Sequence, residues 1–316
     1  MAILKNDLQY HPVIDFIYFG CVIGFGMVLM HPVCLGIGLV SAICCTVHFF
    51  GWNRAKEGFG FLAVLMVITA VMNPAFSHQG ITVITYLPTG NVLTLESVLY
   101  GLAAACMLAE TLLWFRIMCG ILTTDKIVYL FGKGFPVLGL MLSMILGFIP
   151  KIQRKFWEIR LAGQAGHQKE LDMIAKKYNS GVFPSRIKAG IFIKMCRMRY
   201  GTDNLSILIT WILEDAVEMA DSMKGRGYGI EGRTSFTIYR FTKRDTRKLI
   251  LLMAEVVYIL TGILRGGISW DYYPETAGAG FGGYSVSIYI VYLLMCMAPV
   301  IETTAESGRL SMTVGK

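Results

Sequence analysis

Long apolar runs separated by short polar breaks dominate the hydrophobic pattern of the chain. A helix needs about 20 apolar residues to cross the hydrocarbon core of a membrane. Seven runs approach or exceed that length, at residues 13–30, 33–50, 59–76, 94–121, 127–149, 249–265 and 284–301. The composition agrees, because 55% of the residues are hydrophobic and only 16% are charged, which is more apolar than a soluble domain requires. The pattern predicts an all-α membrane protein with several spans and the lipid bilayer as a partner.

The first apolar run does not have the pattern of a cleaved signal peptide. It continues through His31-Pro32 into a second run and lacks a small-residue cleavage site. Counting five crossings before residue 151 places the N-terminus outside if the segment that follows is cytoplasmic. The alternative is that one of the two early runs is re-entrant or lies flat on the membrane.

The charged residues concentrate in one segment. Residues 151–248 hold 20 of the 29 lysines and arginines and 10 of the 21 acidic residues, so this segment carries +10 while the rest of the chain carries −2. The positive-inside tendency favours the cytoplasm for it, and anionic lipid head groups are expected beside Lys151, Arg154 and Lys155. The basic residues follow helical stripes and match no nucleic-acid-binding motif, so nucleic acid is not an expected partner.

Within this basic segment the apolar positions recur at helical spacing. They are residues 205, 208, 209, 212, 213, 216, 219, 220 and 223. This i, i+3, i+4, i+7 pattern predicts a helix over 203–224, with Asp203 as its N-cap and Gly225 at the left-handed C′ position. A second long helix is expected from Ile149-Pro150 to about Tyr178, and a third piece from Pro184 to about Tyr200.

These elements together predict the fold class. We expect a multi-span helical membrane domain interrupted by an inserted cytoplasmic helical coupling domain. The predicted boundaries are 1–150 for the N-terminal transmembrane helices, 151–248 for the cytoplasmic helices and 249–316 for the C-terminal transmembrane helices.

A glycine-rich string follows the predicted helix. Gly227-Tyr-Gly-Ile-Glu-Gly232 formally matches the dinucleotide-binding fingerprint, but that fingerprint requires a preceding β-strand, and no phosphate loop of the form G-x-x-x-x-G-K-[ST] occurs in the chain. What remains is Arg226 between Gly225 and Gly227. Either it is a docking arginine on a rigid helix, or it merely complements the helix dipole, and the spacing alone favours neither.

Metal and cofactor sites have no support in the pattern. The eight cysteines form no C-x-x-C motif and lie almost entirely in apolar runs, and the five histidines are scattered without paired spacing. We therefore expect no metal, no cofactor and no catalytic residue.

Three stretches, taken in order, resemble the transmembrane T component of energy-coupling factor transporters, which is related to the membrane subunit of cobalt-uptake systems. They are "VMNPAFSHQGITVITYLPTGNVLTLESVLYG" (71–101), "DKIVYLFGKGFPVLGLMLSMILGFIP" (125–150) and "MKGRGYG" (223–229). Within the first, the family-motif residues are Asn73, Pro74, Gly80, Thr94 and Glu96. The similarity extends from about residue 59 to 240.

The resemblance implies a function for the whole chain. A T component is not an ATPase: it joins two cytoplasmic ABC-type ATPases to a small membrane subunit that captures a vitamin or a metal ion, in a bacterial or archaeal plasma membrane. Its coupling helices dock on the ATPases through two short Ala-Arg-Gly-like motifs. The second corresponds to Gly225-Arg226-Gly227; the first falls near residues 162–166, where the arginine is missing and the candidates are Arg160, Gln164, Ala165 and Gly166.

Two other classes of function were compared with this one. A membrane-embedded enzyme acting on lipid-linked substrates should show a cluster of reactive side chains, whereas the basic segment offers only dispersed acids such as Glu158, Glu214 and Glu218. A secondary transporter should show an internal repeat, which the chain lacks.

Four charged residues fall in or beside the apolar runs, where an unpaired charge is costly. They are Glu96, Glu110, Arg116 and Glu255. Glu110 and Glu255 are candidates for a proton or ion site, although a structural role at segment ends or toward the protein interior is the preferred interpretation.

Overall fold

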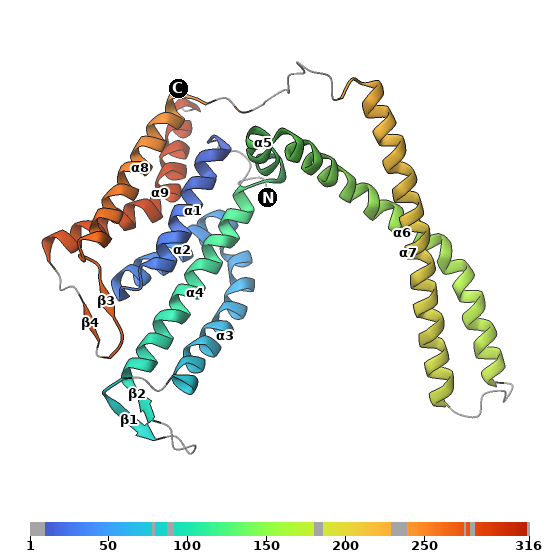
Figure 1. The fold of residues 1–316 in the computed structure, drawn as a ribbon, viewed down its shortest axis with the longest axis horizontal. Coiled ribbons are helices and arrows are strands. Elements are labelled where there is room, and N and C mark those ends of the chain that lie inside the picture. Colours follow the sequence, from blue (N-terminus) through green and yellow to red (C-terminus); the bar gives the residue numbers. More distant parts are fainter. Residues whose placement is uncertain are drawn as a thin grey trace. The chain divides into compact units, whose positions relative to one another are not determined.

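The computed structural model describes residues 10–77, 80–86, 92–179, 186–228, 239, 241–274, 276–278 and 282–314. These residues are mainly helical (Figure 1). The helices are α1 (Pro12–Val28), α2 (Pro32–Phe50), α3 (Trp52–Phe76), α4 (Leu95–Ile121), α5 (Thr124–Gly134), α6 (Pro136–Asn179), α7 (Arg186–Gly225), α8 (Lys243–Leu264) and α9 (Gly283–Val314). Two short antiparallel pairs join β1 (Val83–Tyr86) to β2 (Val92–Thr94) and β3 (Trp270–Asp271) to β4 (Ala277–Gly278).

Five helices of the described residues are long and apolar enough to cross a membrane. By length and composition alone, the candidate spans are Pro32–Phe50, Trp52–Phe76, Leu95–Ile121, Val137–Gly163 and Gly283–Thr304, and Pro12–Val28 is a shorter apolar helix. The window Val137–Gly163 overlaps the segment predicted to be cytoplasmic over residues 151–163. The chain is therefore a multi-pass helical membrane protein, as the hydropathy pattern predicted. The predicted span at 249–265 is not among the five, because α8 carries Arg247, Lys248 and Glu255 along the length that a span would need.

The predicted span at 127–149 is wrong in its boundaries. The helical conformation is interrupted at Phe135 between α5 and α6, and the apolar window begins at Val137. Gly132 and Gly139 approach closely across this break: a Cβ on Gly139 would lie 2.3 Å from the Cα of Gly132. A side chain at position 139 would overlap the backbone of Gly132, so the turn depends on Gly139.

The described chain divides into two compact units. One contains Met1–Leu130 and Tyr239–Lys316, and the other contains Phe131–Ile238. The first unit holds α1 to α4, residues 124–130 of α5, α8 and α9 with both strand pairs, and the second holds the end of α5 with α6 and α7. Each unit has its own packing.

The same tripeptide, His-Pro-Val, begins both α1 and α2. The ring Nδ1 of His11 accepts a hydrogen bond from the N–H of Val13 at 3.4 Å, and His31 accepts one from Val33 at 3.2 Å. Proline at the first helical position costs nothing, because that N–H has no partner within the helix. The imidazole therefore caps a helix that proline has already started.

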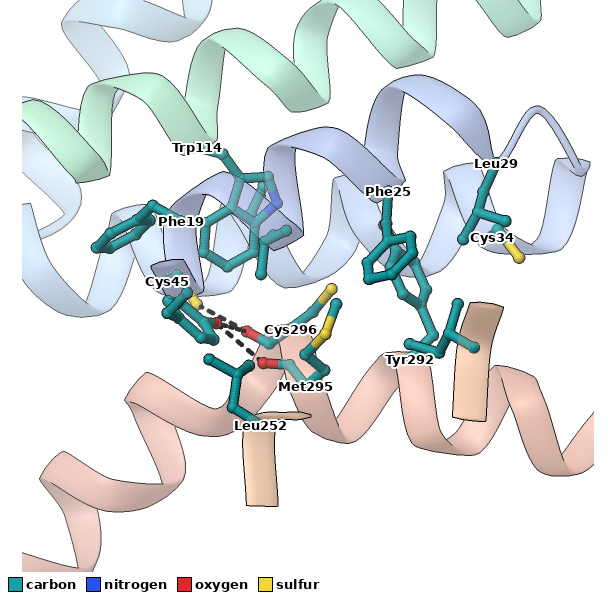
Figure 2. Packing of buried hydrophobic residues seen from close by; sticks show 14 of the residues in the cluster. Phe19, Phe25, Leu29, Cys34, Cys45, Trp114, Leu252, Tyr292, Met295 and Cys296 are labelled. Carbon is teal, nitrogen blue, oxygen red and sulfur yellow. Dashed lines mark hydrogen bonds between the residues drawn. The ribbon is translucent and has the colours of Figure 1, made fainter. Parts of the chain in front are cut away.

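The core of the first unit lies where α1, α2, α4, α8 and α9 meet (Figure 2). Pro299 within α9 has no N–H to bond the carbonyl of Met295 four residues earlier. The hydroxyl of Tyr18 donates to that carbonyl at 2.9 Å, and the thiol of Cys45 donates to the next one, on Cys296, at 3.7 Å. Side chains of α1 and α2 therefore donate to the α9 carbonyls one turn before Pro299, where the hydrogen bonding of the helix itself is weakened.

The second unit is an antiparallel pair of long helices. Lys151 on α6 pairs with Asp215 on α7, and the hydroxyl of Tyr200 donates to the carbonyl of Arg160 at 2.8 Å, so α6 residues later in the chain meet α7 residues earlier in it. The side chain of Tyr200 fits there because Gly163 has no side chain. A Cβ on Gly163 would lie 2.6 Å from the hydroxyl oxygen of Tyr200.

Two predicted helix boundaries in this unit are wrong. Asp203 is not an N-cap, because α7 runs without a break from Arg186 to Gly225. Likewise α6 continues through Pro150 instead of beginning there. A proline or glycine inside a helix costs about 1 to 3 kcal/mol, which packing along a long antiparallel pair can offset.

Candidate functional site

The C-terminus of α7 ends in a glycine cap. The N–H of Gly227 donates to the carbonyl of Lys224 at 3.0 Å, and the N–H of Tyr228 donates to the carbonyl of Met223 at 3.1 Å. Gly227 has φ of 74°. These two bonds and the left-handed residue form a Schellman motif with Gly227 at C′. The prediction that Gly225 takes this position is wrong by two residues, since Gly225 is still helical.

Arg226 is therefore held by a defined backbone. Its N–H donates to the carbonyls of Ser222 and Met223 at 3.1 Å, and its side chain is exposed. The cap fixes the position of the Arg226 backbone and the direction of its Cα–Cβ bond. The exposed side chain beyond Cβ can still rotate. An arginine in this position also complements the negative end of the helix dipole.

A mixed-charge groove of about 460 Å³ borders Arg226. Its lining residues combine cations, carboxylates, hydroxyls and apolar side chains: Leu140, Ser143, Met144, Lys151, Asp215, Glu218, Met219, Ser222, Met223, Arg226 and Tyr228. It lies entirely within the α6 and α7 pair. The surface next to Arg226 thus combines charged and apolar side chains.

An ion pair joins α6 to α7 at the base of this groove. The Nζ of Lys151 is 2.5 Å from Oδ1 of Asp215, whose side chain is only 13% exposed. The same ammonium lies 5.6 Å from the ring centroid of Trp211, and Lys155 lies 5.5 Å from it. Lys151 is thus bonded to α7 although its side chain is 48% exposed, and this pair supports the C-terminal part of α7 laterally.

The candidates for the first docking motif lie on α6. The exposed Arg160 stacks its guanidinium over the ring of Trp157 at 5.2 Å. Gln164, Ala165 and Gly166 continue the same helix, and their side chains fall outside the described residues.

The family-motif residues come together where α3 ends and α4 begins. The Asn73 Nδ2 donates to the carbonyl of Ser97 at 2.8 Å, and Thr94 caps α4 by accepting the N–H of Ser97 at 3.4 Å. Glu96, in the first turn of α4, accepts the N–H of Thr82 at 3.1 Å on Oε1 and 3.3 Å on Oε2. The β1 and β2 hairpin brings Thr82 back to this turn, since Leu95 N–H also donates to the Thr82 carbonyl at 3.0 Å.

Gly80 is required at this junction. Its φ is 130°, and a Cβ there would lie 2.5 Å from Oε2 of Glu96 and 3.0 Å from Oγ1 of Thr94. Both the backbone conformation and the close approach exclude a side chain. Gly80, Thr94 and Glu96 therefore act as one structural unit.

Pro74 makes a second close contact in the same place. It sits inside α3 and leaves the carbonyl of Ala70 without its helical donor. Gly101 of α4 packs against that carbonyl, because a Cβ there would lie 2.7 Å from it. The motif residues thus lock α3 to α4 rather than forming a reactive centre.

Two members of this cluster were missed in the sequence. Ser97 follows Thr94 at a capping spacing, which is a local signal that could have been used. Tyr273 could not have been found in this way: its hydroxyl lies 3.4 Å from Asn73 Nδ2 and from Ser77 Oγ, about 200 residues away in sequence. Such contacts depend on the packing of distant segments.

A second polar cluster joins α1, α5, α8 and α9 in the first unit. Lys126 pairs with Asp15 at 2.6 Å, Lys248 pairs with Glu302, and the His11 Nε2 lies 3.0 Å from the hydroxyl of Tyr129. Desolvation, followed by the charge of Glu302, raises the pKa of Tyr10 to about 12. Tyr129 of this cluster stands next to the unit boundary at Leu130, and its ring lies 5.0 Å from that of Tyr239, where the chain returns to the first unit.

Asp245 organises the start of α8 within this cluster. It completes a capping box with Thr242, whose N–H and hydroxyl donate to Oδ2 at 2.8 and 2.7 Å, and it accepts the N–H of His11 at 3.3 Å. Desolvation opposes ionisation of this carboxyl, but the hydrogen bonds from Thr242 and His11 outweigh it and hold the pKa of Asp245 below its ordinary value.

Three of the four charged residues of the apolar runs have hydrogen-bond partners among the described residues. Arg116 donates to the carbonyl of Arg54 at 2.8 Å, and Glu110 accepts from the hydroxyl of Tyr292 at 3.0 Å. Glu96 is held at the α3–α4 junction described above, and Glu255 is half-buried in α8.

Comparison with known proteins identifies no family: no protein-family model and no curated protein matches the chain. The resemblance to a T component stays a prediction based on the motif residues.

Proposed function

We propose that the chain is the membrane scaffold and energy-coupling subunit of an ATP-driven uptake transporter of the energy-coupling factor type. In this role it joins two cytoplasmic ABC-type ATPases to a small membrane subunit that captures a vitamin or a metal ion. The chain itself is not catalytic. Residues 151–248 lie in the cytoplasm, and the apolar helices lie in a bacterial or archaeal plasma membrane.

The observation that carries this proposal is the exposed Arg226 at the capped end of α7. The helix is 40 residues long and is joined to α6 by the ion pair of Lys151 with Asp215 and by the hydrogen bond from Tyr200. A stiff, supported helix passes a displacement at its tip along its length, and an arginine at the tip supplies a planar, bidentate contact for a carboxylate. These are the two properties that a coupling element requires.

The α3–α4 junction supports the scaffold role. Asn73, Pro74, Gly80, Thr94 and Glu96 are used for capping, close approach and helix-to-helix bonding. The resemblance makes these residues a family signature, and a rigid transmembrane frame is what a scaffold subunit needs in order to hold its partners in register.

The test uses the whole transporter, expressed with its ATPases and purified from detergent through a tag on this chain. Arg226→Ala should reduce co-purified ATPase or uncouple ATP hydrolysis from uptake, since removing one partner of a buried charge pair costs about 2 to 5 kcal/mol. Arg226→Lys should recover part of the loss, because an ammonium cannot reproduce the fork of a guanidinium. Arg154→Ala, another exposed arginine of the helix pair, is the matched control.

Three results would contradict the proposal. The first is wild-type uptake and wild-type ATPase recovery in Arg226→Ala. The second is saturable ATP binding or hydrolysis by the purified chain alone. The third is enzymatic activity on lipid-linked substrates without any ATPase partner, which would favour the alternative class of membrane enzyme.

A further inference from the structure

Glu110 occupies the centre of the first unit. It is fully buried, in the middle of α4, and α1, α2 and α9 pack around it. The fit is tight on two sides: a Cβ on Gly38 of α2 would lie 1.9 Å from Oε1, and a Cβ on Gly26 of α1 would lie 2.8 Å from the same atom. Two helices thus present bare backbone to this carboxyl.

The carboxyl has one hydrogen-bond donor and no cation among the described residues. The hydroxyl of Tyr292 on α9 donates to Oε1 at 3.0 Å, whereas Oε2 has no hydrogen-bond partner there. The titratable side chains that face it are Cys34 from α2, Cys106 from α4 itself, and Tyr292 and Cys296 from α9; α1 contributes only Gly26. None of these carries a positive charge.

An ionised carboxylate is unfavourable in such surroundings. Burying an unpaired charge costs several kcal/mol, and the cost is greater inside a membrane-spanning helix bundle. A neutral carboxylic acid of the same shape avoids that cost and keeps the bond from Tyr292.

We propose that Glu110 is a proton-binding site of the transmembrane unit, and that its bound proton is what allows α1 and α2 to pack against α4 at glycine distance. The proton is taken from and returned to the solvent, and no other group is consumed. This inference does not depend on the proposed transport function, because it rests on the first unit alone.

Infrared spectroscopy of the full purified chain in detergent tests the proposal. A band from a protonated carboxyl group should be present at neutral pH and disappear only at alkaline pH. Glu110→Gln should lack the band. Tyr292→Phe keeps the acid but removes the bond to its oxygen, so the band should persist at a shifted frequency, which assigns it to Glu110 even if Glu110→Gln folds poorly. Glu255→Gln, in the half-buried carboxyl of α8, should leave the band unchanged.

The pH dependence of thermal stability tests the second part of the proposal, that the bound proton allows α1 and α2 to pack against α4. Because the folded state keeps a proton that the unfolded chain releases near the ordinary glutamate value of about 4, the stability of the wild type should fall as the pH rises from there. The fall should level off where the band disappears, and Glu110→Gln should not show it. Absence of the band at neutral pH, or a band unaffected by both Glu110→Gln and Tyr292→Phe, would overturn the proton site. Suppression of the band by sodium at constant pH would replace it with a cation site.

Discussion

The side-chain amide of Asn73 donates a 2.8 Å hydrogen bond to the backbone carbonyl of Ser97, which joins the last turn of α3 to the first turn of α4. The two residues stand on either side of the β1 and β2 hairpin. A side chain that bonds a neighbouring helix backbone fixes both the separation and the rotation of the two helices. The junction is thus defined by one amide and by the glycines that let the helices approach.

Replacing Asn73 with alanine should lower the free energy of unfolding by about 0.5 to 1.5 kcal/mol, the usual net contribution of one such hydrogen bond. Asn73→Asp should be worse, because a carboxylate would face a carbonyl oxygen. The measurement is the fraction of protein that stays monodisperse after heating in detergent. Thr69→Ala is the control, since the Thr69 hydroxyl donates within its own helix, to the carbonyl of Leu65. An equal loss in the control would show that the α3–α4 bond has no special role.

The cap of α7 predicts opposite effects for two neighbouring glycines. Gly227→Ala should destabilise the helix end by about 1 to 2 kcal/mol, because alanine pays for the left-handed conformation. Gly225→Ala should be neutral or stabilising by up to about 1 kcal/mol, because Gly225 is helical and open space surrounds its Cβ position. Amide exchange at residues 226–228 measures both, and equal exchange rates in the two variants would rule out the Schellman assignment.

The glycine facing Glu110 predicts a contrast within one helix. Gly38→Ala should destabilise the first unit by about 1 to 3 kcal/mol, because its Cβ would overlap the carboxyl of Glu110 and force a shift. Gly36→Ala, two residues earlier with nothing near its Cβ position, should be tolerated. The comparison is between melting temperatures of the two purified variants. A stable Gly38→Ala would mean that α2 does not pack closely on α4.

Asp245 predicts an acid-dependent loss of stability. Its pKa is depressed in the folded protein, so the stabilisation from its hydrogen bonds is complete above the ordinary value near 4 and disappears as the pH falls through the lower folded value. Asp245→Asn should therefore be less stable at neutral pH and show a flatter decline below about pH 4. Asp125→Asn, at an exposed position of α5, is the control. Parallel acid profiles in wild type and Asp245→Asn would refute this account.

Local patterns in the sequence determined the membrane class and the helical content. Apolar runs of span length and helical periodicity depend only on neighbouring residues, so both can be found without knowing what the helices contact. The motif residues Asn73, Gly80, Thr94 and Glu96 could also be singled out, but as a family signature only. Their shared position at one junction was not visible, because it depends on a hairpin that folds Thr82 back onto Glu96.

Tertiary structure decided the helix ends and the partners of the buried polar groups. Asp203 and Pro150 both carry local signals for a boundary, yet α7 and α6 continue through them. Contacts along a long antiparallel pair outweigh the local cost, which is about 0.7 kcal/mol or less for an aspartate and about 3 kcal/mol for a proline. The Tyr292 hydroxyl reaches Glu110 across 182 residues of sequence. A pairing of this kind is set by how four helices pack, so the sequence determines that Glu110 must be accommodated, whereas only the folded chain determines how.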